Sequence, residues 1–311
     1  MEKAHRAGIM VREYYARPDP AIAGEAEKRG LEYVPVVWVP EAGSASEGVV
    51  DVYGGRRLFA FNNSGCISNP SIRKRVLARV EEAATRLEAE AVILDALRFP
   101  SPHDKAVMFS CFCPHCRRTM VEQGVDPERL RSGLARAAGT LYKYPHLRRE
   151  ALAAFHAWIW VRQHIVGETL GLVREKAREY GLRLWAAVFP PSLAWLVGQN
   201  YEDLRGQLDE VHVMLYHKCS GAACLNHELQ SLAGLIGGGN ARTALRILAG
   251  IDVEDPSTLD SNGLSVEAIV EEAKRAVGIL GEKTVPILQL DSQGLEAAGR
   301  LRGTAKIAYL A

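Results

Sequence analysis

Short apolar runs rich in valine, isoleucine and leucine alternate along the chain with longer stretches in which apolar residues recur every three or four positions. The short runs are typical of buried β-strands, and the longer stretches are typical of amphipathic helices. Strands are predicted over eight ranges: 8–13, 33–39, 91–99, 182–189, 210–216, 246–252, 285–291 and 306–311. Helices are predicted between them, over 19–30, 71–88, 147–180, 193–207, 223–236, 264–280 and 293–302.

Eight strands that alternate with helices predict an α/β fold of the (β/α)8 TIM-barrel class. Neither a GxGxxG after the first strand nor a GxxxxGK[ST] is present to favour an open nucleotide-binding sheet. We therefore expect a single barrel domain over 1–311, with long insertions at about 42–70 and 99–146, after the second and third strands. Barrel active sites are built from the loops that follow the strands, so these insertions mark the expected functional face.

Composition and charge indicate a globular protein without a general attraction for nucleic acid or membranes. The 311 residues are 48% hydrophobic, enough for a large core. The 38 lysines and arginines balance 37 acidic residues, so no net field attracts nucleic acid or an anionic membrane. No apolar run reaches the roughly 20 residues of a membrane span. We expect a cytoplasmic protein, and the plentiful Glu and Arg with sparse Asn and Gln are typical of thermophiles. The oligomeric state, including a homo-oligomer, stays open.

Three cysteines lie within six residues of the segment SCFCPHC, at Cys111, Cys113 and Cys116. A tight turn can bring their sulfurs to one point, and Cys66 in the other long insertion can supply the fourth ligand of a tetrahedral Zn²⁺ site. Such a closed set of thiolates predicts a structural role for the ion.

Other readings of these thiols stay open at this point. His115 and His103 are the lesser candidates for the fourth ligand. A reactive thiol would need a paired base, and the common iron–sulfur spacings differ from this one. Four cysteines buried only by packing are the remaining alternative.

The segments GCISNPSIRKRVLARVEEA, AVILDALRFP and CFCPHCRRTM resemble a run found in many glycoside-hydrolase barrels. One cysteine followed 45 positions later by CxCxxC is similar to the zinc cluster of the family 42 β-galactosidases. The LDxxRFP segment more closely resembles a broad set of hypothetical glycosyl-hydrolase barrels. The resemblance covers about 58–120, and it implies a TIM barrel with a zinc cluster that acts on carbohydrate.

One departure limits this resemblance. Family 42 enzymes carry an Asn-Glu pair at a strand end, where the Glu is the acid/base, whereas this chain reads Leu94-Asp95-Ala96. The resemblance therefore implies the fold and the metal cluster but not the family 42 activity.

Glycosidic bonds are broken by two carboxyl groups that face each other across the sugar. Asp95 is the first candidate, because it follows the apolar AVIL and the resemblance implies a catalytic role for the Asp of LDxxRFP. Asp252, Asp291 and Glu13 each end a predicted strand, and the sequence does not choose among them as the second carboxylate. Each of them is equally well explained as a loop or helix-cap residue.

Side chains near these strand ends supply the predicted carbohydrate contacts. Aromatic rings there can stack on the apolar face of a sugar, and an arginine can bind its hydroxyl or acidic groups. The predicted substrate-binding residues are Arg98, Trp38, Tyr216, His217, Arg12 and Tyr14.

A second group follows the fifth predicted strand: His217, Cys219, Cys224 and His227. These side chains suit zinc, but the two cysteines can instead form a short-loop disulfide or stay unpaired. Three hypotheses result. The first is a glycosidase, the second a carbohydrate-binding barrel that has lost its acid/base, and the third a metal-dependent hydrolase that uses this second group.

Overall fold

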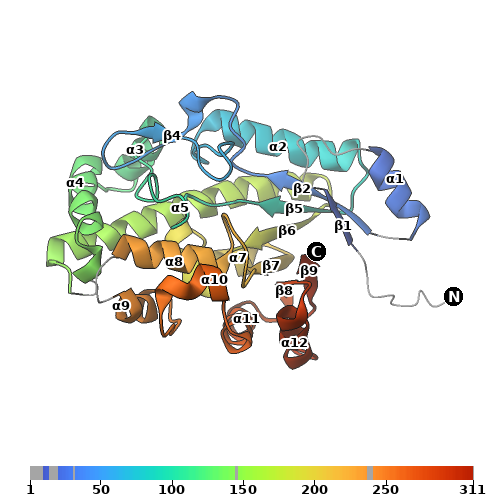
Figure 1. The fold of residues 1–311 in the computed structure, drawn as a ribbon. Coiled ribbons are helices and arrows are strands. Elements are labelled where there is room, and N and C mark those ends of the chain that lie inside the picture. The colour runs from blue at the N-terminus through green and yellow to red at the C-terminus, as the bar shows by residue number, and fades with distance from the viewer. Residues whose placement is uncertain (1–9, 14–19, 31, 144–145, 237–240, 311) are drawn as a thin grey trace.

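The computed structural model describes residues 10–13, 20–30, 32–143, 146–236 and 241–310, and its centre is a curled parallel β-sheet (Figure 1). Seven strands follow one another in the order β1-β2-β5-β6-β7-β8-β9, and each pairs in parallel with the next. Their bounds are Met10–Glu13, Glu32–Trp38, Ala91–Asp95, Arg183–Val188, Glu210–Leu215, Thr284–Gln289 and Ala308–Leu310. The arrangement is that of a TIM-like α/β fold.

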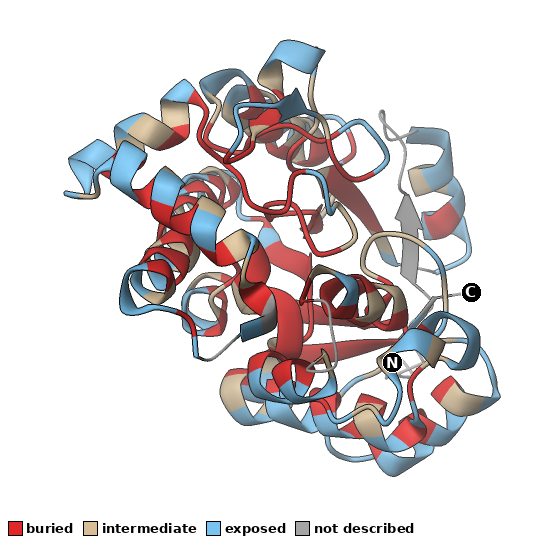
Figure 2. Cartoon of the chain, turned by 60° about the vertical axis from the view of Figure 1, so that its left-hand side comes forward, coloured by how far each residue is buried: buried red, intermediate tan, exposed pale blue. Residues whose placement is uncertain are grey.

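The middle of the sheet is buried on both faces, which explains the continuous apolar runs in its strands. Every residue of β5 is buried, as is all of β6 after Arg183 and of β7 after Glu210. Figure 2 shows these strands in red at the centre, with exposed residues on the outer helices.

Helices connect successive strands and cover the outside of the sheet. Their bounds are Pro20–Lys28 for α1, Pro70–Thr85 for α2, Arg149–Glu179 for α5, Tyr201–Gln207 for α7, Val266–Leu280 for α11 and Ser292–Arg300 for α12. Helix α2 packs on β2 and α5, and α11 packs on β7 and β8. None of the helices in the described ranges has both the length and the apolar character needed to cross a membrane.

The remaining elements nearly all lie in connections that follow strands β2, β5, β6 and β7. After β2 come η1 (Ala45–Glu47), β3 (Val49–Val50) and β4 (Arg56–Arg57), and after β5 come α3 (Pro114–Glu122), α4 (Pro127–Ala138) and η2 (Leu141–Lys143). Helix α6 (Pro191–Ala194) and η3 (Trp195–Val197) follow β6. After β7 come α8 (Leu225–Ile236), α9 (Ala241–Leu248), η5 (Pro256–Thr258) and α10 (Leu259–Asn262), and η6 (Gly281–Lys283) directly precedes β8. These connections therefore begin at the carboxyl end of the sheet, where TIM-like folds carry their sites.

The predicted strand over 246–252 is wrong. Residues 241–248 form α9, which buries Ala244, Leu245 and Leu248, and the chain then continues as a loop. Those three residues recur at helical spacing, and a short apolar run by itself fits a buried helix as well as a buried strand. The other predicted strands overlap the seven strands described above.

Candidate functional site

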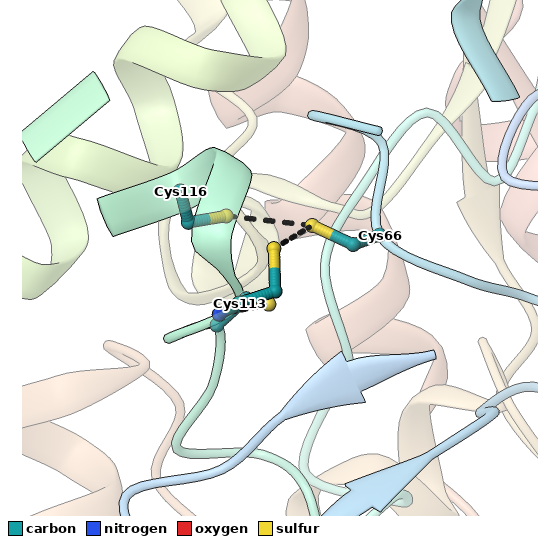
Figure 3. Close-up of side chains that lie close together, drawn as sticks. Cys66, Cys113 and Cys116 are labelled. Atoms are coloured by element: carbon teal, nitrogen blue, oxygen red, sulfur yellow. Dashed lines mark hydrogen bonds between the residues drawn. The ribbon is translucent and has the colours of Figure 1, made fainter. Parts of the chain in front are cut away.

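Four buried cysteine sulfurs gather where the connections after β2 and β5 meet, and Figure 3 shows those of Cys66, Cys113 and Cys116. The Cys66 sulfur lies 3.4 Å from that of Cys116 and 3.6 Å from that of Cys113. With Cys111 included, all four lie within 4.8 Å of one another. Thiolates around one tetrahedral zinc, at Zn–S of about 2.3 Å, would lie about 3.8 Å apart, whereas disulfide sulfurs lie about 2.05 Å apart. The four cysteines are therefore close enough to bind one metal ion.

Local structure explains how the cysteines converge. Cys113 is the N-cap residue of α3 and Pro114 begins the helix, so the first turn brings Cys116 to the same side as Cys113. The backbone N–H of Cys66 donates to the carbonyl of Glu47, which holds the segment before α2 against the connection after β2. The start of α3 thus positions Cys113 and Cys116, and the backbone contact with Glu47 positions Cys66.

Hydrogen-bond donors point at the sulfurs. The N–H groups of Val50 and Cys113 donate to the sulfur of Cys111, at 3.3 and 3.4 Å. Ser68 lies 3.0 Å from the sulfurs of Cys66 and Cys116. Donors of this kind orient metal ligands and stabilise negative charge on sulfur.

The cluster is costly to ionise by itself. Burial raises the pKa of the Cys111 and Cys116 thiols, whereas the hydrogen bond with Cys111 lowers the pKa of Cys113. A bound divalent cation would offset this cost, because metal ligation favours the thiolate.

A buried arginine lies behind the cluster. Arg162 of α5 donates to the carbonyl of Ser110 at 2.9 Å, and its guanidinium stacks on the Trp158 ring at 4.0 Å. Trp158 donates to the same carbonyl at 2.7 Å. Burial lowers the pKa of Arg162, and the nearby sulfurs of Cys111 and Cys116 oppose that shift. Arg162 therefore holds the backbone immediately before Cys111.

Neither of the two histidines considered as a fourth ligand belongs to the group of four converging side chains. His115 lines a surface pocket of about 200 Å³ beside the cluster, together with Glu47, Arg56 and Asn69. His103 lies in the connection after β5, where its ring is 5.0 Å from that of His227. In the described part of the chain, the group of potential metal ligands is the four cysteines.

A second group of polar side chains occupies the carboxyl ends of β2 and β5. Asp95 ends β5, is 8% exposed, and accepts a hydrogen bond from the N–H of Ala96. Trp38 ends β2 opposite Asp95 in the sheet register, so both side chains point to the same face. The indole N–H of Trp38 donates to Ser64 at 3.0 Å.

Arg98 follows Asp95 and is buried between two aromatic rings. Its guanidinium lies 5.5 Å from the ring centre of Phe59 and 5.1 Å from that of Phe189. One nitrogen lies 3.9 Å from Oδ2 of Asp104. That oxygen is buried and has no hydrogen-bond partner among the described residues, while Oδ1 accepts from the N–H of Ala60. Oδ2 of Asp104 thus faces the Arg98 charge without a hydrogen bond of its own.

Glu228 of α8 joins this group from the connection after β7. Its carboxylate is fully buried and accepts from the Ser101 hydroxyl and the N–H groups of His103 and Ala223, at 2.7, 2.8 and 3.0 Å. Burial raises the pKa of Glu228, and the Arg98 charge opposes that shift. Glu228 therefore ties the connections after β5 and β7 together. No motif or strand end in the sequence marks Asp104 or Glu228.

The other predicted carboxylates lie in varied settings. Asp291 caps α12 by accepting from the N–H of Gly294, and its Oδ2 lies 3.2 Å from Nε2 of His217. Asp252 follows α9 instead of a strand, and it forms an exposed ion pair with Arg242 at 2.9 Å. Glu13 is the last residue of β1, and its side chain lies outside the described part of the structure.

The remaining predicted contacts also differ in position. Tyr216 and His217 follow β7 and are buried, and burial lowers the pKa of His217. Arg12 lies in β1 without a described side chain, and Tyr14 lies outside the described residues.

The metal centre considered for His217, Cys219, Cys224 and His227 needs correction. Cys219 and Cys224 form a disulfide, so their sulfurs are not free to bind a metal. His227 instead lies 3.0 Å from Asp260. Of the three states left open by the sequence, the structure has the short-loop disulfide.

Comparison with known proteins places the fold. No protein-family model and no curated protein matches the chain. Among solved structures, it is similar to the glycoside hydrolase domain of PgaB from Bordetella bronchiseptica, with TM-score 0.58, 13% identity, and coverage of 94% of this chain and 74% of that domain. It is also similar to the catalytic domain of β-amylase from Paenibacillus polymyxa, with TM-score 0.50, 15% identity, and coverage of 93% and 78%. The chain therefore has a glycoside-hydrolase-like fold.

Proposed function

We propose that this protein is a glycoside hydrolase whose site lies at the carboxyl ends of β2 and β5. The observation that carries the proposal is the buried Asp95 at the end of β5, with Trp38 beside it in register and the Arg98–Asp104 pair just beyond. TIM-like enzymes carry their catalytic groups at these strand ends, and the fold is shared with glycoside hydrolase domains.

In this proposal Asp95 and Asp104 are the two carboxylates that act on the glycosidic bond. One protonates the leaving oxygen, and the other attacks the sugar carbon or activates a water molecule. We favour Asp104 over Asp291, because Asp104 follows the same strand as Asp95 and its Oδ2 accepts no hydrogen bond from the described residues, whereas the two oxygens of Asp291 lie against Gly294 and His217. Arg98 contacts Asp104 and lies between Phe59 and Phe189, which fixes its position beside the substrate.

We further propose that the four cysteines hold a structural Zn²⁺ ion. Four buried sulfurs complete a tetrahedral set and leave no position for water, which distinguishes a structural site from a catalytic one. When bound, the ion would crosslink the connections after β2 and β5.

Hydrolysis of an oligosaccharide panel, followed by release of reducing ends, tests the assignment. Asp95→Asn and Asp104→Asn are each expected to lower kcat by about 10²- to 10⁴-fold, the usual contribution of a general acid or base. The matched control is Asp203→Asn, an exposed aspartate on α7, which should keep wild-type activity. Full activity in Asp95→Asn would remove Asp95 from the reaction.

A further inference from the structure

The turn between Phe59 and Ser64 has an unusual backbone. Ala60, Phe61 and Asn62 have φ values of 38°, 60° and 58°, so three successive residues without glycine adopt the left-handed region. Asparagine tolerates this region, but alanine and phenylalanine rarely occupy it. Such a backbone persists where surrounding contacts impose it, and it often marks a functional position.

Contacts at both ends impose this conformation. Phe59 and Ser64 exchange two backbone hydrogen bonds, at 3.0 and 3.1 Å. The N–H of Ala60 donates to Asp104, and the buried Phe59 ring packs on Arg98. The turn is thus fixed to the same two charged groups that form the proposed site.

The turn holds one aromatic ring in solvent. Phe61 is 71% exposed, whereas its neighbours Phe59 and Ala60 are both 2% exposed. The Phe61 ring centre lies 6.2 Å from that of Trp38, and the two planes are inclined at 55°. Trp38 is itself half-buried and shares its sheet face with Asp95. Two rings from separate segments therefore meet beside the proposed catalytic carboxylate.

We propose that Phe61 and Trp38 form a stacking subsite for a pyranose ring. Sugars whose substituents are all equatorial, namely β-linked glucose and N-acetylglucosamine, present flat C–H faces that suit an aromatic surface. This inference rests on the proposed function and adds to it the class of sugar that the site binds.

Isothermal titration calorimetry with cellohexaose, chitohexaose and maltohexaose tests the subsite. The titrations use the Asp95→Asn background, so that bound sugar is not cleaved. We expect binding of cellohexaose or chitohexaose in preference to the α-linked maltohexaose. Phe61→Ala should raise Kd about tenfold, and Phe61→Trp should change it by less than about threefold, because the ring surface is kept.

Tyr53→Ala is the matched control, because Tyr53 is an equally exposed aromatic residue (74%) on the neighbouring β3–β4 hairpin. Its Kd should equal that of the parent. An unchanged Kd in Phe61→Ala would overturn the subsite, as would failure of the parent to bind any of the three sugars.

The two proposals fail separately. Hydrolysis by the wild type with a Kd that ignores Phe61 would contradict the subsite alone. Binding that depends on Phe61, with no hydrolysis by the wild type, would contradict the hydrolase alone. Thermal unfolding of Phe61→Ala checks that the exposed substitution leaves the fold intact.

Discussion

At the scale of single residues, the buried carboxylate of Glu228 organises the carboxyl end of the sheet. It accepts three hydrogen bonds, two of them from the connection after β5, while its own helix follows β7. Removing such an acceptor leaves buried donors without partners, and the resulting cost exceeds that of losing an exposed charge.

Glu228→Ala is therefore expected to lower the free energy of unfolding by roughly 3–5 kcal/mol. Urea denaturation measures the change. Glu296→Ala provides the comparison, because Glu296 is exposed and pairs with Arg300 on the surface of α12. Equal effects of the two substitutions would contradict the role given to Glu228.

Some carboxylates of the candidate site can be predicted from the sequence, and others cannot. Asp95 is foreseeable, since the apolar run before it predicts a buried strand that ends at this carboxylate. Asp104 and Glu228 owe their burial to partners 44 and 125–127 positions away in the sequence. No local pattern encodes contacts at that separation, so only the folded structure reveals these two carboxylates.

At the scale of elements, a charged group fastens the amino end of β7 to the segment before β9. Glu210 lies 3.2 Å from His212 and 2.9 Å from Lys306. Burial opposes ionisation of Glu210, but its hydrogen bonds with His212 and Lys306 outweigh burial and lower its pKa to about 2. The folded chain thus keeps this carboxylate charged at a pH where the unfolded chain takes up a proton.

The sign of the pH dependence follows from that difference. The stabilisation from Glu210 is present above its ordinary pKa of 4.5 and is lost as the pH falls from 4.5 to about 2. Glu210→Gln should flatten the loss of unfolding free energy over this window, as measured by denaturant titrations at several pH values. Glu90→Gln, at a side chain 88% exposed, should keep the wild-type slope. An unaltered slope in Glu210→Gln would refute the assignment.

The elements themselves were predictable where their patterns are long. Helix α5 and the buried strands β5, β6 and β7 follow directly from periodicity and apolar runs. Helix α4 lies within the predicted insertion at about 99–146, for which no helix is predicted. Its start nevertheless carries a helix-start pattern, since Asp126 caps it and Pro127 begins it. Residues 246–252 were misassigned because seven residues are too few to separate the two periods.

At the scale of the whole molecule, the four cysteines bring together two connections, although Cys66 and Cys111 lie 45 positions apart in the chain. The cysteine spacing predicts that these four side chains converge, and the structure brings their sulfurs within 4.8 Å of one another. Metal binding to a folded site adds its free energy to that of folding.

Removing the metal is expected to weaken the attachment between the connections after β2 and β5. The protein should contain about one zinc per chain, and a chelator should lower Tm and expose residues 99–146 to trypsin. Cys66→Ser should lose the zinc in elemental analysis. Cys219→Ser should keep it, because Cys219 belongs to the disulfide. Undiminished zinc in Cys66→Ser would contradict the four-cysteine site.

The 31 residues of α5 extend over about 46 Å, and the helix contacts both the sheet and the connection after β5. Trp158 and Arg162, one turn apart, both donate to the carbonyl of Ser110, immediately before Cys111, and α5 also packs on α2, α4 and β6. The connection after β5 is consequently held at Ser110 by this 31-residue helix. We therefore expect the segment around Ser110 to stay in place against α5 and not to open and close over the site.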